Sequence, residues 1–207
     1  MIFSLLRFYY RLKPSFLGFW FKLLFTHKGL RIGKNFKCDT FPKMLIDKGS
    51  KVEIGSDVIF RRNVEIRSHG NSTIKIGDNC RIDRGVRLLS ANQSALTLES
   101  GVRIGLYSVF NGGDSIIVGA KTLISGFVYL QTSMHNYKGN NAIQEQGYSH
   151  SPIVIGEDNW LGTHVVVFPG VTLSEKCVVG SNSVLNKSFG PNSIVAGSPA
   201  ALLTKKS

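Results

Sequence analysis

His135 stands directly before the one long stretch of this chain that shows no regular pattern. It lies in the run Gln131-Thr132-Ser133-Met134-His135-Asn136-Tyr137, and the unpatterned stretch follows at about 136–152. An imidazole can accept a proton near neutral pH and return it later, which suits general acid–base catalysis. Long structureless loops in compact domains are usually functional or disordered. His135 is therefore the leading candidate for chemistry.

The other four histidines give weaker signals. No motif surrounds His27, His69 or His150, and we expect these side chains to be solvated. His164 follows Leu161-Gly162-Thr163, at a place in the repeat described below where a polar corner residue is expected.

The three cysteines predict a reduced, buried role. Cys38, Cys80 and Cys177 form no C-x-x-C pair and are odd in number, so we expect reduced core residues in a cytoplasmic chain.

A six-residue repeat must position His135. Ile155, Leu161, Val167, Leu173, Val179, Leu185 and Pro191 are spaced by six, and an inward second series lies four residues further on, from Asn159 to Val195. Neither the helix period of 3.6 nor the strand period of 2 gives six, whereas a parallel β-helix built from hexapeptides does. Three hexapeptides make one triangular coil, and glycine relaxes its corners.

The repeat continues upstream with longer coils. First-face positions Ile54, Ile76, Leu98 and Val118 are separated by 22, 22 and 20 residues, and the extra residues all follow the third face. A weaker start appears at Leu30–Gly33. The step from Val118 to Ile155 is 37 residues, and we interpret it as one excursion loop. The fold prediction is all-β: a parallel β-helix over residues 31–200.

The first thirty residues differ from the rest. They are aromatic, carry five Lys and Arg and no acidic residue, and contain no apolar run of about 20 residues. No signal-peptide cleavage site is present. Two short helices around Pro14 are predicted. They could anchor the chain on an anionic membrane surface, cap the open end of the β-helix, or do both. Residues 201–207 read as a basic tail.

The net charge of +12 predicts attraction to polyanions, anionic membranes or phosphate-bearing cofactors. The basic residues are spread along the chain without a nucleic-acid-binding module, so no nucleic acid partner is expected.

The C-terminal coils resemble the hexapeptide-repeat acyltransferases, in the branch of maltose, galactoside and polysaccharide O-acetyltransferases. The motifs are Ile155-Gly156 with Trp160-Leu161-Gly162, the run Phe168-Pro169-Gly170-Val171, and the closing Ile194–Ala200. The resemblance implies a left-handed β-helix, a homotrimer with active sites between subunits, and acetyl transfer from acetyl-CoA. It assigns the catalytic role to His135, as the base that takes the acceptor's proton.

The resemblance also implies a coenzyme site. Trp160 corresponds to the family's tryptophan beside the pantetheine, although a subunit-interface role is the alternative. Gly162, Thr163 and Ser181 correspond to the positions along the pantetheine arm, and Asn186 and Lys187 to the next pair. The family's basic residues after the Pro-Ala turn align here with Ala201 and Thr204. Lys205 and Lys206 are expected to supply the charge instead, unless they are a frayed tail.

Acceptor contacts are less specific. Asn111 and Gln131 occupy equivalent places in neighbouring coils and would offer amides to a sugar, or form a polar ladder. Glu145, with Gln146, would close over the site. Tyr137, like Tyr148, would offer a ring for a pyranose.

We therefore predict an acetyl-CoA-dependent O-acetyltransferase for a sugar hydroxyl of a bacterial surface polysaccharide or its precursor, cytoplasmic or peripheral at the inner membrane. The alternatives are an amino-sugar, serine or drug acceptor, or a non-catalytic β-helix binding protein. A zinc site like that of β-helical carbonic anhydrases needs three converging histidines, and the close pair that would seed it is absent, so no metal is expected.

Overall fold

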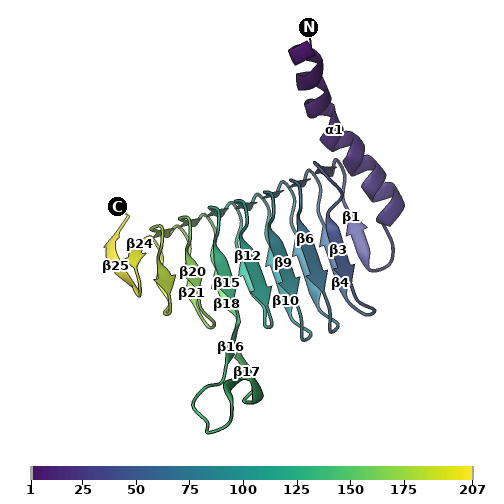
Figure 1. Ribbon diagram of the computed structural model, residues 1–207. Coiled ribbons are helices and arrows are strands. Elements are labelled where there is room, and N and C mark those ends of the chain that lie inside the picture. The colour runs from purple at the N-terminus through teal and green to yellow at the C-terminus, as the bar shows by residue number, and fades with distance from the viewer. Residues whose placement is uncertain (1, 207) are drawn as a thin grey trace.

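The computed structural model describes residues 2–206, which form a parallel β-solenoid with one helix at its N-terminal end (Figure 1). Each turn adds one short strand to each of three sheets, here called faces A, B and C, in that order along the chain. Face A has seven strands, so the solenoid has about seven turns. The predicted parallel β-helix is confirmed.

The strand bounds follow the three faces. Face A contains β1 (Leu30–Ile32), β4 (Lys51–Ile54), β7 (Thr73–Ile76), β10 (Ala95–Leu98), β13 (Ile116–Val118), β18 (Ile153–Ile155) and β21 (Thr172–Leu173). Face B contains β2 (Lys37–Cys38), β5 (Ile59–Phe60), β8 (Arg81–Ile82), β11 (Arg103–Ile104), β14 (Leu123–Ile124), β19 (Trp160–Leu161), β22 (Val178–Val179), β24 (Ser193–Gly197) and β25 (Ala200–Lys205). Face C contains β3 (Lys43–Ile46), β6 (Glu65–Ser68), β9 (Arg87–Ser90), β12 (Val109–Gly112), β15 (Tyr129–Gln131), β20 (Val166–Val167) and β23 (Val184–Leu185).

The predicted register is confirmed turn by turn. Ile76 pairs with Leu98, Leu98 with Val118, and Val118 directly with Ile155. The 37-residue step is therefore a single turn with one excursion inserted. The columns on faces B and C match the predicted positions in the same way.

The last turn departs from the predicted spacing. Leu173 bridges Phe189 instead of Pro191, and Val179 pairs with Val195, so this turn has 16 residues. Phe189 is buried and Pro191 is exposed. The physical reason lies in the backbone: the Phe189 amide donates to the Thr172 carbonyl at 3.0 Å, whereas proline has no amide hydrogen to donate.

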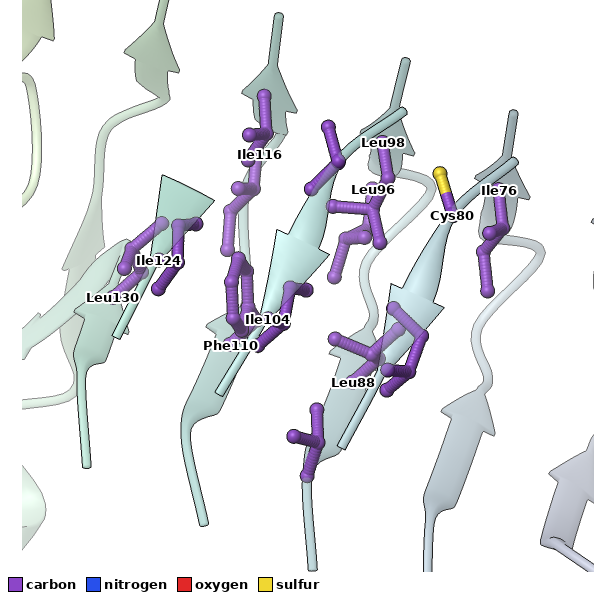
Figure 2. Close-up of a cluster of buried hydrophobic side chains, with 14 of the residues drawn as sticks. Ile76, Cys80, Leu88, Leu96, Leu98, Ile104, Phe110, Ile116, Ile124 and Leu130 are labelled. Carbon is purple, nitrogen blue, oxygen red and sulfur yellow. The ribbon is translucent and has the colours of Figure 1, made fainter. Parts of the chain in front are cut away.

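Apolar side chains from the three faces meet inside the solenoid (Figure 2). The labelled residues, among them Ile76, Leu98 and Phe110, come from successive turns and form a single core. Cys38, Cys80 and Cys177 are free and buried, as predicted. Burial raises the pKa of the Cys38 thiol to about 12 and that of Cys80 to about 11, which keeps both thiols neutral.

The extra residues after face C build wide turns along the edge between faces C and A. Buried serines hold these turns together. The hydroxyls of Ser68 and Ser72 lie 2.9 Å apart, and Ser72 donates to the Ser90 carbonyl of the next turn at 2.7 Å. Ser90 in turn lies 3.0 Å from Ser94. The C–A edge thus carries longer connections than the other two edges.

The N-terminal segment forms one helix, α1 (Ile2–Phe25), with Pro14 inside it, so the prediction of two short helices is wrong. Its second half packs on the open end of the solenoid. Phe21 is buried, with its ring centroid 5.9 Å from that of Phe36 and 5.5 Å from that of Phe41. A Cβ on Gly18 would lie 2.0 Å from the Phe36 carbonyl oxygen, so only glycine allows this approach. α1 therefore caps the core.

The C-terminal end is closed differently. Residues 201–205 of the predicted tail belong to β25, which pairs antiparallel with β24 and extends face B (Figure 1).

The core should be sensitive to side-chain loss in proportion to burial. Leu88 is fully buried on β9, whereas Leu45, on the same face in β3, points outward. We expect Leu88→Ala to cost about 2–5 kcal/mol and lower the melting temperature by about 5–20 °C, because it leaves a cavity. Leu45→Ala, the matched control, should cost less than about 1 kcal/mol. Thermal unfolding followed by circular dichroism measures both, and equal losses would contradict this account of the core.

Candidate active site

A two-stranded arm leaves the solenoid at the C–A edge, between β15 and β18 (Figure 1). Its strands are β16 (Ser133–His135) and β17 (Tyr148–His150), which pair antiparallel, and its tip includes the 3₁₀ helix η1 (Ile143–Glu145). This arm is the predicted excursion, although it begins at Ser133, three residues before the predicted start. The arm makes its own strand pairing because it lies outside the solenoid sheets.

His135 is the last residue of β16 and is exposed. It therefore lies on the arm, outside the coils of the solenoid. Its cross-strand partner is Tyr148, and the two ring centroids are 4.2 Å apart with the planes tilted by 40°. This contact fixes one side of the imidazole and leaves the rest of the ring accessible to a substrate.

A second histidine joins this cluster. The Ser133 hydroxyl lies 2.8 Å from His150 Nδ1, and the His150 ring centroid is 6.3 Å from that of Tyr148. His150 is exposed, as predicted, but it also takes part in these contacts, which the sequence did not suggest. Alternation along paired strands puts Ser133, His135, Tyr148 and His150 on one side of the arm. That signal is readable only once the pairing of the two strands is known.

Two residues at the base of the arm set its position. Thr132 is buried; its hydroxyl accepts from the Asp114 amide at 2.9 Å and its carbonyl accepts from the Ser151 amide at 3.0 Å. A Cβ on Gly113 would lie 2.2 Å from Ser133 Oγ and 2.9 Å from His150 Nδ1. Glycine at this position therefore lets the previous turn pass beneath the Ser133–His150 pair.

The tip of the arm is held by Gln146. Its side-chain Oε1 accepts from the Gly139 backbone amide at 2.8 Å. Its side-chain Nε2 donates to the carbonyls of Gly139 and Asn141 at 3.2 and 2.6 Å. The predicted acceptor residue Glu145 lies beside it in η1 and is exposed. Gln146 is thus a structural clamp of the loop, which differs from the predicted closing role.

The other predicted acceptor residues lie near the arm's base and along it. Asn111 and Gln131 are paired in register on face C and half-buried, as their spacing predicted. The Gln131 side chain donates to the Ser133 carbonyl, so it is tied to the start of the arm. Tyr137 is exposed on the arm two residues beyond His135.

Part of the predicted coenzyme set lies on face B and at the edge that follows it. Trp160 is 53% exposed on β19, and its indole donates to Ser125 Oγ at 3.3 Å. A Cβ on Gly162 would lie 2.6 Å from the Ser181 amide, so close stacking alone explains this glycine. The Thr163 hydroxyl donates to the Gly126 carbonyl at 2.8 Å.

The remaining predicted coenzyme residues lie elsewhere. Asn186 and Lys187 follow β23 and are exposed at the C–A edge, the edge that also bears the arm. Lys187 Nζ lies 5.7 Å from the Phe189 ring centroid. Lys205 is exposed on β25, and the Lys206 backbone amide donates to the Asn192 carbonyl at 2.7 Å. Within one chain, the predicted site residues therefore fall into two groups on different sides of the solenoid.

A column of aromatic rings runs along the B–C edge beside Thr163. The rings of Tyr107 and Phe127 stack with centroids 5.6 Å apart, and Phe127 and His164 stack at 5.0 Å with planes 3° apart. All three residues have φ between 55 and 60°, a left-handed conformation that costs bulky side chains of order 1–2 kcal/mol each. His164 is thus more than a polar corner residue. The sequence could have revealed this column, because each of the three rings lies three residues before a buried face-C position.

Within residues 2–206, no three His, Cys, Asp or Glu side chains gather as a metal site would require.

Comparison with known proteins shows what the chain resembles. No protein-family model matches the sequence. A provisionally named lipopolysaccharide biosynthesis O-acetyl transferase of Escherichia coli is 29% identical over 155 residues, 71% of this chain and 78% of the relative. The galactoside O-acetyltransferase of the same species is 32% identical over 111 residues, 50% of this chain and 54% of the relative. In sequence, this chain is similar to hexapeptide-repeat acetyltransferases. A provisionally named colanic acid biosynthesis acetyltransferase of E. coli is 37% identical over 106 residues, and its match again spans about half of each chain.

Solved structures show that this chain shares its fold with known enzymes. A polysialic-acid-specific acetyltransferase superposes with a TM-score of 0.64 at 20% identity, covering 87% of this chain and 82% of the other. An N-acyltransferase from Bacillus cereus, in complex with dTDP and 3-hydroxybutyryl-CoA, superposes with a TM-score of 0.63 at 19% identity, covering 86% and 85%.

The role of Gln146 as a clamp can be tested with its neighbour as control. We expect Gln146→Ala to loosen the tip of the arm, because three hydrogen bonds across the loop are lost. Trypsin should then cut after Lys138 about tenfold faster, in line with a local loss of roughly 1–2 kcal/mol. Glu145→Ala, which removes none of these bonds, should be cut at the rate of the unaltered protein. Equal cleavage of both variants would contradict the clamp.

Proposed function

We propose that this acetyltransferase moves the acetyl group of acetyl-CoA onto a sugar hydroxyl of a bacterial surface polysaccharide or of its precursor. His135 acts as the general base. The observation that carries the proposal is the position of this residue: an accessible imidazole on a defined arm, packed on one side by Tyr148 and anchored at its base by Thr132. The second histidine of the arm, His150, has its Nδ1 2.8 Å from the Ser133 hydroxyl, so His135 is the better candidate for the base.

The reaction needs one proton acceptor and no covalent enzyme intermediate. The acceptor oxygen attacks the thioester carbonyl while His135 takes the hydroxyl proton. The C–S bond then breaks, the thiolate leaves as coenzyme A, and the proton returns to it from the imidazolium. The Tyr148 ring holds the orientation of the imidazole during both proton transfers. Tyr137, on the arm, and Gln131, at its start, would contact the sugar.

The choice of acceptor rests on the relatives. Two E. coli relatives are named for lipopolysaccharide and colanic acid biosynthesis, and one structural neighbour for polysialic acid. The B. cereus neighbour is an N-acyltransferase, which keeps an amino-sugar acceptor as the second candidate. Serine or drug acceptors and a non-catalytic binding role have no such support.

The two groups of site residues support a site formed between chains. His135 and Lys187 lie at the C–A edge, whereas Trp160, Thr163 and Ser181 lie on face B and the B–C edge. One chain cannot bring these together, but the C–A edge of one protomer placed against the B–C edge of another can. The exposed rings of Tyr107 and Phe127 on that second edge are apolar surface that such a contact would cover. A closed homotrimer contains three of these contacts.

The charge of the chain suits coenzyme A. Lys187, Lys205 and Lys206 are exposed toward the C-terminal end of the solenoid and would pair with its phosphates as point charges. Trp160 would cover the pantetheine near the thioester.

Loss of the base should abolish turnover without loss of binding. We expect His135→Ala to reduce acetyl transfer by about 10²–10⁴-fold, because the hydroxyl then lacks a proton acceptor. Thiol release from acetyl-CoA, measured against sugars, nucleotide sugars and oligosaccharide repeat units, gives the rate, and calorimetry gives coenzyme binding. His69→Ala, in a wide turn of an earlier coil, is the control and should retain activity. Unchanged turnover in His135→Ala would refute the role, and transfer only to amino sugars would favour the second candidate.

A site shared between chains predicts complementation between inactive variants. Subunits carrying His135→Ala, co-assembled with subunits carrying Trp160→Ala, should regain activity, because some contacts join an intact arm to an intact face B. Co-assembly of His135→Ala with Lys187→Ala should regain none, since both residues belong to the same edge. Thiol release from the refolded mixtures measures this. Recovery in neither mixture would contradict a site shared between chains.

A further inference from the structure

The inference concerns α1, which is apolar on two opposite faces. Leu17, Gly18 and Phe21 turn toward the solenoid and cap its core. At 100° per residue, a second stripe lies on the opposite side of the helix. It consists of Tyr9, Leu12, Phe16, Phe19, Trp20 and Leu23. We call this set the outer stripe.

The large apolar side chains of the outer stripe are exposed to solvent. Phe16 is 63%, Phe19 62% and Leu23 61% exposed. Within the stripe, the Trp20 ring centroid lies 6.2 Å from that of Phe16 and 5.9 Å from that of Phe19. Contiguous exposed apolar surface of this kind marks a binding surface.

Cationic side chains flank the outer stripe. Eight Lys and Arg and no acidic residue precede Asp39 in the sequence. Lys34 and Lys37 line the groove beside Phe19, and Arg61 and Arg62 line the groove beside Tyr10 and Lys13 on the other side of the helix. The acidic residues of these grooves are engaged: Asp39 pairs with Arg61 at 3.3 Å, and Asp57 accepts from Asn35 at 3.0 Å.

We propose that the outer stripe of α1 docks on the surface of an anionic lipid bilayer. Trp, Tyr and Phe favour the boundary between headgroups and acyl chains, and the flanking Lys and Arg would meet the lipid phosphates. A second copy of the chain suits this surface less well, because pairing two such helices would bring like charges together. No helix within residues 2–206 has the length and apolar content to cross a membrane, so the contact is peripheral.

This geometry leaves the candidate active site in solvent. The arm follows β15, which is four strand spacings along face C from β3 at the capped end. At about 4.8 Å per spacing, the arm stands roughly 20 Å away from that end. Docking therefore should not alter turnover of a soluble acceptor, and the proposal is independent of the proposed reaction.

Co-sedimentation of the full chain with lipid vesicles tests the proposal. We expect binding to vesicles of phosphatidylglycerol and phosphatidylcholine, weak binding to phosphatidylcholine alone, and a loss of binding as salt is raised. Phe16→Ser with Leu23→Ser should weaken binding about a hundredfold, because each buried apolar side chain contributes about tenfold. Leu202→Ser with Leu203→Ser is the matched control: it removes two exposed apolar side chains from β25, at the other end of the solenoid, and should bind normally.

A second measurement distinguishes docking from folding or self-association. In a Trp160→Phe background, the fluorescence of Trp20 should shift to the blue on vesicles and be quenched by lipids brominated near the headgroup. Sedimentation velocity shows whether Phe16→Ser with Leu23→Ser changes the oligomer, and circular dichroism shows whether it folds. Equal binding of the two double variants, or binding that ignores the anionic lipid, would overturn the proposal. So would a change of oligomer with no vesicle binding by the unaltered protein.

Discussion

The structure depends on one constraint: each turn of the solenoid satisfies its backbone hydrogen bonds through the turns on either side. The Gly119 amide, for example, donates to the Ile155 carbonyl at 2.7 Å, across 36 residues of sequence. Because the bonds run along the solenoid axis, inward side chains of neighbouring turns must lie directly above one another. The columns of Ile, Leu and Val follow from this stacking. Each turn must also bring the chain back to the strand of the previous turn, so that the two strands can pair. A turn can change length only at a corner.

This constraint explains where function can be placed. The buried polar side chains are engaged in hydrogen bonds within the solenoid, as Ser72 and Asn159 are, so chemistry must lie on outward positions, at edges, or on an excursion. The arm is an insertion at the C–A edge that leaves the stacking intact, since Val118 and Ile155 pair across it. It carries its own strand pairing, which orients His135 against Tyr148. The solenoid supplies a rigid base through Thr132 and Gly113, so the arm's position depends on the stacking below it.

The two open ends of a solenoid pose a separate problem, because their strands have no neighbour on one side. Here β25 turns back antiparallel on β24 at one end, and α1 covers the other through Phe21. A helix that must cover apolar surface on one face need not be apolar on the other. The outer stripe of α1 therefore exposes more apolar surface than capping requires. The aromatic column at the B–C edge likewise exposes more apolar surface than a corner requires. Both surfaces point to contacts outside one chain.

The sequence by itself determined the solenoid, its register on all three faces and the location of the excursion, because a six-residue period has no other regular explanation. It also singled out His135, since that residue stands where the period stops. It did not determine the shortened last turn, which depends on the absent amide hydrogen of Pro191. Nor did it reveal the pairing of Ser133 with His150, the clamp made by Gln146, or the stacking of His164 on Phe127. The Ser133–His150 and Phe127–His164 contacts join residues 17 and 37 positions apart, and the Gln146 clamp depends on the path of the loop. All three were decided only by the tertiary structure, because the fold of the arm and the stacking of corners bring these residues together.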